Sequence, residues 1–269
     1  MDEDLRSVTP PGTIGVTVGI GHGFSSVARL SAACFTENTG IPAVVLGQNA
    51  LDESGFEHPA ALRLRIFDLV DAETVVYFDA DWLCLRKWTL PLDSPGIVAG
   101  RDFILREEWP EQDYQFSSKV FSEPPAQLRC AGGSPRLRAE YINEVREFSD
   151  LRLPLDAWIN SGLMILHRAS HARLLRTAER LYRLSVGHHD VYFEQPALLK
   201  AIEIESEPVT LLPRACNVLA AHERLWPDTV IGLHIKLRRH AQFLSAIAAG
   251  TITDPLSVRK HFTTPGSVS

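Results

Sequence analysis

Short runs of β-forming residues alternate with helical patterns through the first third of the chain. Strand patterns cover residues 13–20, 41–47 and 74–78, and helix patterns cover 25–40 and 58–70. Ser25 or Ser26 provides an N-cap for the first helix, and Gly40 provides its C-terminal stop. Parallel strands need crossover connections, which are usually helices. The β-α-β-α-β order therefore predicts an α/β fold with a parallel sheet covered on both faces.

A polar interruption follows, and then the regular pattern returns. A fourth strand pattern covers 94–102, and residues 104–155 are rich in Pro, Glu and Arg, with one helix pattern near 137–148. Later strand patterns cover 158–168, 208–212 and 230–237, and helix patterns cover 171–185 and 194–202. We expect a single domain over residues 1–269, with 104–155 as a variable insertion and 262–269 as a flexible tail.

Composition and charge limit the kinds of partner. The chain has 269 residues, of which 45% are hydrophobic and 22% charged, and its formal net charge is −6. These values are typical of a globular protein with a large core, and no basic stripe with interleaved aromatics favours a nucleic-acid partner. No stretch approaches the ~20 apolar residues that span a bilayer. The acidic start MDEDLRSVTPPG does not resemble a signal peptide, so we expect a cytoplasmic protein with no transmembrane segment.

The cysteines predict neither a zinc site nor a disulfide framework. Cys34, Cys84, Cys130 and Cys216 lie far apart and form no Cys-x-x-Cys pair. This spacing favours buried or incidental thiols.

Two carboxylates stand at the end of the third strand pattern. The apolar run VVYF is typical of a strand buried on both faces, and Asp79 and Asp81 follow it. Ligand sites of open α/β sheets lie at the carboxyl ends of strands. Two converging carboxylates repel each other unless a cation lies between them, and their oxygens suit magnesium or manganese, which in turn binds a substrate diphosphate. The pair therefore predicts a nucleotide site, and an Asp-x-Asp that merely ends a strand is the alternative.

A dinucleotide-binding site is not favoured. Gly19, Gly21 and Gly23 lack the third glycine of that fingerprint in its position, and the second strand ends in Gly47-Gln48-Asn49 without the acid that binds an adenosine ribose. A permissive turn that leaves the first strand is the better interpretation of these glycines.

Four segments, in order, resemble a known family. They are LRLRIFDLVDAETVVYFDADWLCLR, WINSGLMIL, EQPALL and GLHIKLR. Their content and order are similar to the retaining glycosyltransferases of family 8, which include glycogenin and bacterial galactosyltransferases. The resemblance covers about Thr13 to Arg239 and is weakest between Ile104 and Leu155. It implies the GT-A fold, a Rossmann-like nucleotide-binding sheet flanked by helices, with the 104–155 insertion on the acceptor side.

The resemblance implies a metal site and a basic donor contact. By it, Asp79, Asp81 and His234 bind Mn²⁺ (or Mg²⁺), which bridges the diphosphate of a nucleoside diphosphate sugar. A late histidine in an apolar strand is otherwise more often a core residue. Arg63 matches a basic position that contacts donor phosphate or sugar, and a solvated helix face beside Arg65 is the alternative.

The resemblance also implies a sugar pocket. Asp102, Asn160 and Ser161, the last two in an Asn-Ser-Gly turn, match groups that hydrogen-bond the hydroxyls of the donor sugar. Carboxylates and amides suit this task, because a missing hydroxyl then leaves a buried polar group unpaired. Glu194 and Gln195 match the catalytic pair beneath the anomeric carbon.

The sequence departs from the family in two places. Glu194 stands where the family usually has aspartate, and its longer side chain displaces the carboxylate by about one bond length. A misplacement of ~1 Å can reduce the rate of catalysis strongly. The usual Gly and Lys-Pro-Trp after the late histidine are absent, and Lys236 or Arg238 is left to reach the β-phosphate.

The expected reaction is transfer of a hexose-type sugar from a nucleoside diphosphate, with uridine diphosphate favoured, to an acceptor hydroxyl. We expect retention through front-face attack, because the neutral amide of Gln195 is a poor nucleophile. The expected acceptor is a small molecule, a soluble glycan or a natural product, since no basic amphipathic tail indicates a membrane surface. Acceptor-stacking candidates are Trp109, Tyr114 and Phe116, which could equally anchor a long loop.

Other functions remain open from the sequence. A sugar-phosphate nucleotidyltransferase uses the same metal and carboxylates, and a catalytically silent protein would only bind the nucleotide sugar. An inverting enzyme would need a general base, for which the candidates are Glu107, Glu108 and Asp113. The run His188-His189-Asp190 is better explained as a turn than as a metal cluster, because adjacent residues rarely converge on one ion.

Overall fold

The strand predicted at 74–78 lies at the centre of the molecule. In the computed structural model of the chain, every residue of β3 (Thr74–Phe78) is buried. Val75 and Tyr77 belong to one apolar cluster, and Val76 and Phe78 belong to another on the opposite face. Coverage of both faces explains why this strand is apolar without alternation. The structure describes residues 12–21, 23–102, 142–143, 145–147, 150–185, 194–219, 229–235 and 241–263.

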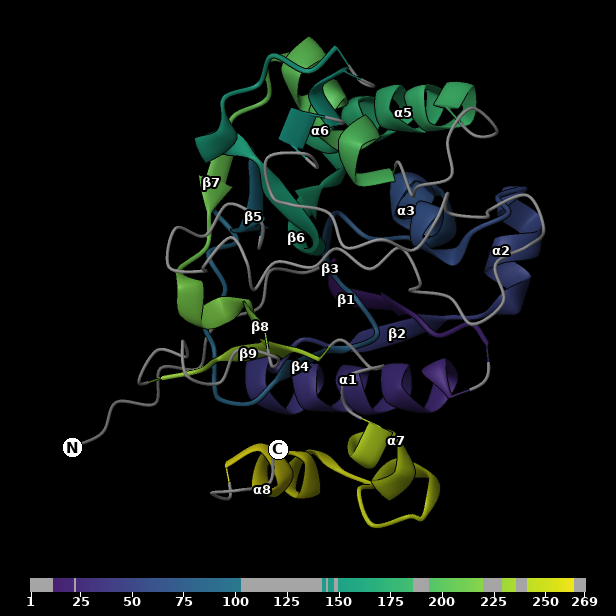
Figure 1. The fold of residues 1–269 in the computed structure, drawn as a ribbon, viewed down its shortest axis with the longest axis vertical. Helices are drawn as coiled ribbons and strands as arrows, with labels where there is room; N and C mark the ends of the chain where they lie inside the picture. The colour runs from purple at the N-terminus through teal and green to yellow at the C-terminus, as the bar shows by residue number, and fades with distance from the viewer. Residues whose placement is uncertain are drawn as a thin grey trace.

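Six strands form the main sheet, in the order β2-β1-β3-β6-β5-β7 (Figure 1). Besides β3 they are β1 (Thr13–Val18), β2 (Ala43–Leu46), β5 (Ile97–Arg101), β6 (Ile159–His167) and β7 (Val209–Leu211). The predicted α/β class is confirmed, and β1 pairs in parallel with β2 and β3. Only β6 runs antiparallel to its two neighbours, β3 and β5. Antiparallel neighbours such as β5 and β6 need no crossover connection between them.

The direction of β6 decides what lies at the carboxyl edge of the sheet. Because β6 is antiparallel, its first residues lie beside the last residues of β3, and Phe78 pairs with Leu163. The end of β5 reaches the same edge, since Gly100 pairs with Asn160. The edge therefore collects the start of β6 and the ends of β3 and β5.

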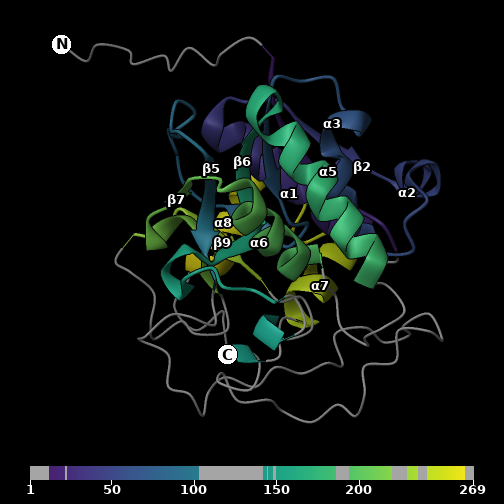
Figure 2. The same cartoon turned by 90° about the horizontal axis from the view of Figure 1, so that it is seen from above.

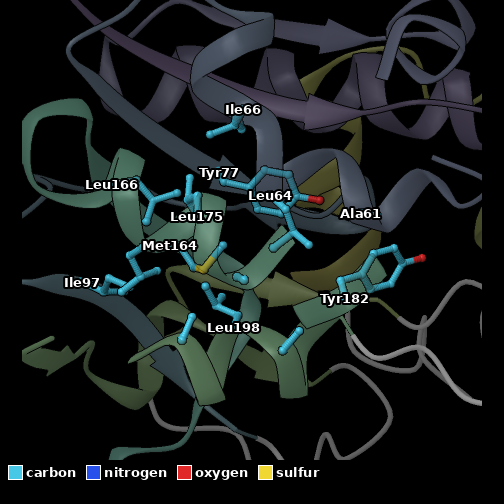
Figure 3. Packing of buried hydrophobic residues seen from close by; sticks show 14 of the residues in the cluster. Ala61, Leu64, Ile66, Tyr77, Ile97, Met164, Leu166, Leu175, Tyr182 and Leu198 are labelled. Atoms are coloured by element: carbon cyan, nitrogen blue, oxygen red, sulfur yellow. The ribbon is translucent and has the colours of Figure 1, made fainter. Parts of the chain in front are cut away.

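Helices cover both faces of the main sheet. The helices α5 (Arg168–Ser185) and α6 (Glu194–Glu205) lie over one face, as Figure 2 shows from above. Their apolar residues join Tyr77, Leu64 and Met164 in the largest core cluster (Figure 3). On the other face, α1 (Phe24–Thr39) contributes Phe35 to the second cluster. Among the helices that the structure describes, none is both long and apolar enough to cross a membrane.

The first predicted helix has a different start from the one expected. Gly23, with φ 83°, precedes α1, and Ser25 instead donates its hydroxyl to the carbonyl oxygen of Gly19 at 2.8 Å. The predicted stop is confirmed, because Gly40 adopts the left-handed conformation with φ 76°. Gly21 also has a positive φ of 93°, which agrees with a turn at the end of β1.

The helix predicted over 58–70 is divided in two. A 3₁₀ helix, η1 (Pro59–Arg65), is followed by the short helix α3 (Ile66–Leu69). His58 precedes η1 and its Nδ1 accepts a hydrogen bond from the backbone N–H of Ala60. Arg63 folds back on the same turn, with Nε donating to the carbonyl oxygen of Ala60 at 2.9 Å. This tight turn directs the guanidinium toward the main sheet.

A second, three-stranded sheet lies beside the first, in the order β4-β9-β8. Its strands are β4 (Trp82–Cys84), β8 (Val218–Leu219) and β9 (Gly232–His234). The sequence predicted a strand around β9 but not β4 or β8. The residues of β4 directly follow the paired acids and β8 has two residues, so neither stands out as a separate apolar run, whereas β9 lies within the longer apolar pattern of 230–237.

Three helices were also missing from the sequence prediction. They are α2 (Gln48–Ser54), α7 (Ala241–Ala248) and α8 (Pro255–Thr263). Phe243 of α7 and Phe262 of α8 are buried in a third apolar cluster with Val27 and Leu30 of α1. Placing Phe262 in a flexible tail was therefore wrong, because its ring is part of this small core. Residues 264–269 lie outside the described residues.

The described cysteines are free thiols, as expected. Cys34, Cys84 and Cys216 are all buried, and Cys130 lies outside the described residues. Burial raises the pKa of both Cys34 and Cys84 to about 12. These thiols therefore stay protonated and serve as small apolar core residues.

Candidate active site at the carboxyl edge of the sheet

Two carboxylates and one imidazole converge at the end of β3. One ligand atom from each of Asp79, Asp81 and His234 lies within 4.8 Å of the others. His234 Nε2 is 3.1 Å from Asp81 Oδ1 and 3.7 Å from Asp79 Oδ2. The structure thus brings together the three residues that the sequence analysis proposed as metal ligands.

Backbone pairing between β4 and β9 brings His234 to the acids. Trp82 pairs with His234, and the N–H of Ile235 donates to the carbonyl oxygen of Asp81 at 2.7 Å. Trp82 is itself fully buried, and its indole Nε1 donates to the carbonyl oxygen of Cys216 at 3.0 Å. The short turn after Asp79 therefore carries the chain directly from the main sheet into the small one.

Gly162 of β6 leaves the space in which these ligands meet. A Cβ atom at Gly162 would lie 2.4 Å from Asp79 Oδ2, 2.8 Å from His234 Cε1 and 2.9 Å from Asn160 Oδ1. Its carbonyl oxygen accepts a hydrogen bond from the N–H of Asp79 at 2.9 Å. The residues fit a divalent ion, because two carboxylate oxygens and an imidazole nitrogen face one confined, glycine-lined space. The sequence analysis noted the Asn-Ser-Gly motif but missed the role of this glycine.

Arg63 is part of the site and does not belong to a solvated helix face. It is 4% exposed, and its Nη2 lies 2.8 Å from Asp79 Oδ1. Its Nη1 donates to Ser161 Oγ at 2.5 Å, and its guanidinium lies 4.7 Å from the centre of the Tyr77 ring. Arg65 is the residue that reaches outward, where it pairs with Asp68 at 3.0 Å. The tight η1 turn therefore directs Arg63 into the site and Arg65 toward the surface.

A second network extends from Ser161 toward β5. Gln195 Oε1 accepts hydrogen bonds from the backbone N–H of Ser161 at 3.0 Å and from its hydroxyl at 3.1 Å. Gln195 Nε2 donates to Asp102 Oδ2 at 2.7 Å. Ser161 and Asp102 are both buried. Arg63 therefore connects the carboxylates at the end of β3 to the polar groups expected to contact a sugar.

Asn160 and Ser161 belong to β6 and do not form the turn that the sequence analysis expected. The pairing register between β5 and β6 shifts after Ala99, and Gly100 pairs with Asn160. Asn160 Oδ1 accepts hydrogen bonds from the N–H of Gly162 at 3.2 Å and from Asn217 Nδ2 at 3.1 Å. Asn217 is 1% exposed and was not predicted, because a lone asparagine between two short elements carries no pattern.

Glu194 lies at the first position of α6, beside Gln195. It is 8% exposed, and within the described part of the chain its Oε2 has no hydrogen-bond partner. Burial raises the pKa of the Glu194 carboxyl, and the nearby charge of Arg63 opposes this rise. A buried carboxyl with one uncommitted oxygen is unusual outside functional sites.

Several candidates lie outside the described residues. They are Lys236 and Arg238 for the diphosphate, Trp109, Tyr114 and Phe116 for the acceptor, the possible bases Glu107, Glu108 and Asp113, and the run His188-His189-Asp190.

Solved structures share the architecture of this chain. No protein-family model matches the sequence, and no curated protein matches it significantly. The bifunctional glycosyltransferase WbbM, in its apo form, superposes with a TM-score of 0.55 and 12% identity over 86% of this chain and 46% of that one. The galactosyltransferase LgtC, in complex with donor and acceptor sugar analogs, superposes with a TM-score of 0.51 and 12% identity over 88% of this chain and 95% of that one.

The chain has the GT-A fold. This architecture was expected from the resemblance and is confirmed by the two superpositions. The chain spans about half the length of WbbM and most of LgtC. At 12% identity the likeness concerns the fold, and the chemistry has to be argued from the site itself.

Proposed function

We propose that this protein is a metal-dependent glycosyltransferase that moves a hexose-type sugar from a nucleoside diphosphate sugar to an acceptor hydroxyl with retention of configuration. The observation that carries the proposal is the continuous network from the cluster of Asp79, Asp81 and His234, through Arg63, to Ser161 and Gln195. The GT-A fold supports the same reaction class.

The acids and the histidine would hold Mn²⁺ or Mg²⁺. When bound, the ion would neutralise the negative charge that grows on the departing diphosphate. The protein's own contribution is to hold two carboxylates close together at low exposure, with side-chain exposures of 25% for Asp79 and 19% for Asp81. Lys236 or Arg238 would add a cation on the β-phosphate side.

The buried polar groups next to this cluster would select the sugar. Asp102, Ser161 and Asn160 are already fixed by hydrogen bonds to Gln195 and Asn217. Preorganised polar groups discriminate strongly against a sugar without the matching hydroxyl, because one of them would then stay buried without a partner. Glu194 would contribute the uncommitted Oε2 to the same pocket.

The contacts of Gln195 support a positioning role for its side chain. Its Oε1 accepts two hydrogen bonds from Ser161, and its Nε2 donates to Asp102. Both the oxygen and the nitrogen of the amide are therefore engaged. This favours a role in positioning the sugar over a role as the nucleophile that attacks the anomeric carbon. Front-face attack by the acceptor hydroxyl, assisted by the leaving diphosphate, is the mechanism that fits such a neutral, fixed side chain.

The proposed donor class follows from the resemblance, and the proposed acceptor class is the one expected from the sequence. Uridine diphosphate is the proposed nucleotide, and the acceptor is a small molecule, a soluble glycan or a natural product. We propose that residues 104–155 form the acceptor side, since β5 ends at Arg101, next to Asp102, at the edge that carries the site. A cytoplasmic location is proposed on the basis of the sequence.

Thermal unfolding against a panel of nucleoside diphosphates and their sugars tests the proposal. Each ligand is measured with Mn²⁺, with Mg²⁺ and with chelator, and a ligand at a hundredfold excess over its dissociation constant adds ~2.7 kcal/mol. We expect one nucleotide to stabilise the protein only with metal, and Asp81→Ala or His234→Ala to abolish that gain. Asp68→Ala, which alters an exposed carboxylate outside the site, is the control. If no nucleotide stabilises the protein with any metal, the proposed function is wrong.

Two further assays separate this function from the alternatives. A sugar-phosphate nucleotidyltransferase would release pyrophosphate from a nucleoside triphosphate and a sugar phosphate, whereas a silent binding protein would gain stability without transfer or hydrolysis. Anomeric analysis of the product distinguishes retention from the inversion that a base in the 104–155 segment would give.

A further inference from the structure

Tyr77 contacts Asp79, one member of the cluster of two acids and a histidine, from inside the core. Tyr77 is in β3 and lies two residues before Asp79, which directly follows the strand, and the alternation of side chains directs both to the same side. Tyr77 is 1% exposed and belongs to the largest apolar cluster with Leu64 and Met164 (Figure 3). Its hydroxyl donates to Asp79 Oδ1 at 3.1 Å.

Arg63 donates to the same oxygen. Its Nη2 is 2.8 Å from Asp79 Oδ1, and its guanidinium lies over the Tyr77 ring at 4.7 Å. The ring therefore supports the cation, and the hydroxyl and the cation together occupy one carboxylate oxygen. The other oxygen, Oδ2, is the one that lies 3.7 Å from His234 Nε2. The two oxygens of Asp79 thus have different surroundings, one committed to the protein and one facing the cluster.

We propose that Tyr77 is a positioning residue that, together with Arg63, restricts Asp79 to binding the metal through Oδ2 alone, and thereby sets the metal preference of the site. The inference rests on the proposed function, since it assumes that the cluster binds a divalent ion. Calcium accepts two oxygens of one carboxylate and about six to eight ligands in total, whereas magnesium requires a near-ideal octahedron. A carboxylate limited to one oxygen favours the smaller ions.

A purely structural role for Tyr77 makes a different prediction. If the ring only fills the core, Tyr77→Phe keeps that packing and leaves the affinity for every ion unchanged. If the hydroxyl restricts Asp79, the same variant releases part of Oδ1 and lets a larger ion bind both oxygens. The affinity ratio between calcium and manganese therefore separates the two roles.

Isothermal titration calorimetry of the full chain with Mn²⁺ and with Ca²⁺, in the presence of uridine diphosphate, measures this ratio. We expect Tyr77→Phe to weaken Mn²⁺ binding about tenfold, as is typical when a partner of a metal ligand is removed. We expect Ca²⁺ binding to fall much less, so that the ratio moves severalfold toward Ca²⁺. Tyr182→Phe is the matched control, because Tyr182 is 7% exposed in the same cluster and packs edge-on against Phe56.

Unchanged affinities in folded Tyr77→Phe would overturn the inference, and so would an equal loss for both ions, which indicates a loosened carboxylate rather than a change in its denticity. The same shift in Tyr182→Phe would overturn it as well. If the wild-type protein binds neither ion, both the proposed function and this inference are wrong. If the wild type binds the ions and Tyr77→Phe shows no shift in the affinity ratio, only the inference about Tyr77 is wrong. If Tyr77→Phe does not fold, Arg63→Lys alters the other donor to Oδ1 and is expected to shift the ratio in the same direction.

Discussion

The candidate site is built from two sheets that hold their residues in different ways. On the side of the six-stranded sheet, side chains bind one another: Arg63 bonds to Asp79 and Ser161, and Ser161 bonds to Gln195. On the side of the three-stranded sheet, His234 is placed by backbone pairing of β9 with β4. Side-chain networks fix individual oxygens, whereas backbone pairing fixes a whole strand.

This difference indicates which half of the site is preorganised. The main sheet is covered on both faces by large clusters, and its polar network is held by hydrogen bonds between side chains. The small sheet depends on packing against α1, α7 and α8 through the third cluster. We therefore expect the position of Asp79 to be independent of any ion, and the position of His234 to follow the stability of the small sheet.

The largest effect on binding is expected at Gly162, where the residues held by the six-stranded sheet meet His234 of the three-stranded sheet. Gly162→Ala would place a methyl group 2.4 Å from Asp79 Oδ2 and 2.8 Å from His234 Cε1. Metal-dependent nucleotide binding should fall by about 100-fold, which is the upper range for disturbing the surroundings of metal ligands. Gly47→Ala is the control, because Gly47 has an extended φ of −108° and open space around its Cβ position. Equal binding by the two variants, measured by calorimetry, would mean that the halves do not meet as described.

Loosening the small sheet tests whether His234 depends on its packing. Phe243 is fully buried in the third cluster, and Phe243→Ala should lower the free energy of unfolding by about 3–5 kcal/mol. Hydrogen exchange should rise in β4 and β9 and much less in β3 and β6. Leu174→Ala, in the largest cluster, serves as the comparison. Uniform exchange across both sheets would show that they unfold as one unit and that the contrast drawn between them is wrong.

The two acids should differ in the absence of metal. Asp79→Asn leaves the buried Arg63 without its counter-charge and should cost about 1.5–3 kcal/mol, the range for hydrogen bonds to charged groups. Asp81→Asn alters a more weakly paired side chain, whose Oδ1 lies 3.1 Å from His234 Nε2, and should cost less, about 0–1 kcal/mol. Urea unfolding in chelator measures both. Similar losses in the two variants would contradict the separate roles given to the two halves.

The smallest expected effect concerns Glu194 and depends on pH. Burial raises the pKa of its carboxyl above the ordinary value of 4.5, so the folded protein binds this proton more tightly than the unfolded chain. Stability is therefore unaffected below that value and decreases as the pH rises toward the folded pKa. Glu194→Gln should melt a few degrees above wild type at neutral pH, and the two Tm values should converge near pH 4. A Tm difference that does not change with pH would mean that burial of charge is not the cause.

The elements that lie within clear apolar patterns were predictable, and the elements without such a pattern were not. β1, β3, β6, α1, α5 and α6 each extend over several residues with clear apolar patterns and were found near their observed positions. The single helix expected over 58–70 was wrong in detail, because the buried contacts of Arg63 accompany a tight 3₁₀ turn that a local pattern does not reveal. Gly162 and Asn217 act through contacts with residues that are distant in sequence, so no spacing could have indicated them.

The sequence by itself determined that two acids stand at the end of a buried strand. Apolar β-forming residues before Asp79 and Asp81 suffice for that, because strand formation and burial follow from local composition. Only the tertiary structure decided which atoms of those acids face one another. The antiparallel direction of β6, the η1 turn that buries Arg63 and the pairing of β4 with β9 assign Oδ1 of Asp79 to the protein and Oδ2 to the cluster. Such assignments depend on hydrogen-bond distances and angles between segments that are distant in sequence. Residue types and their spacing do not encode this geometry.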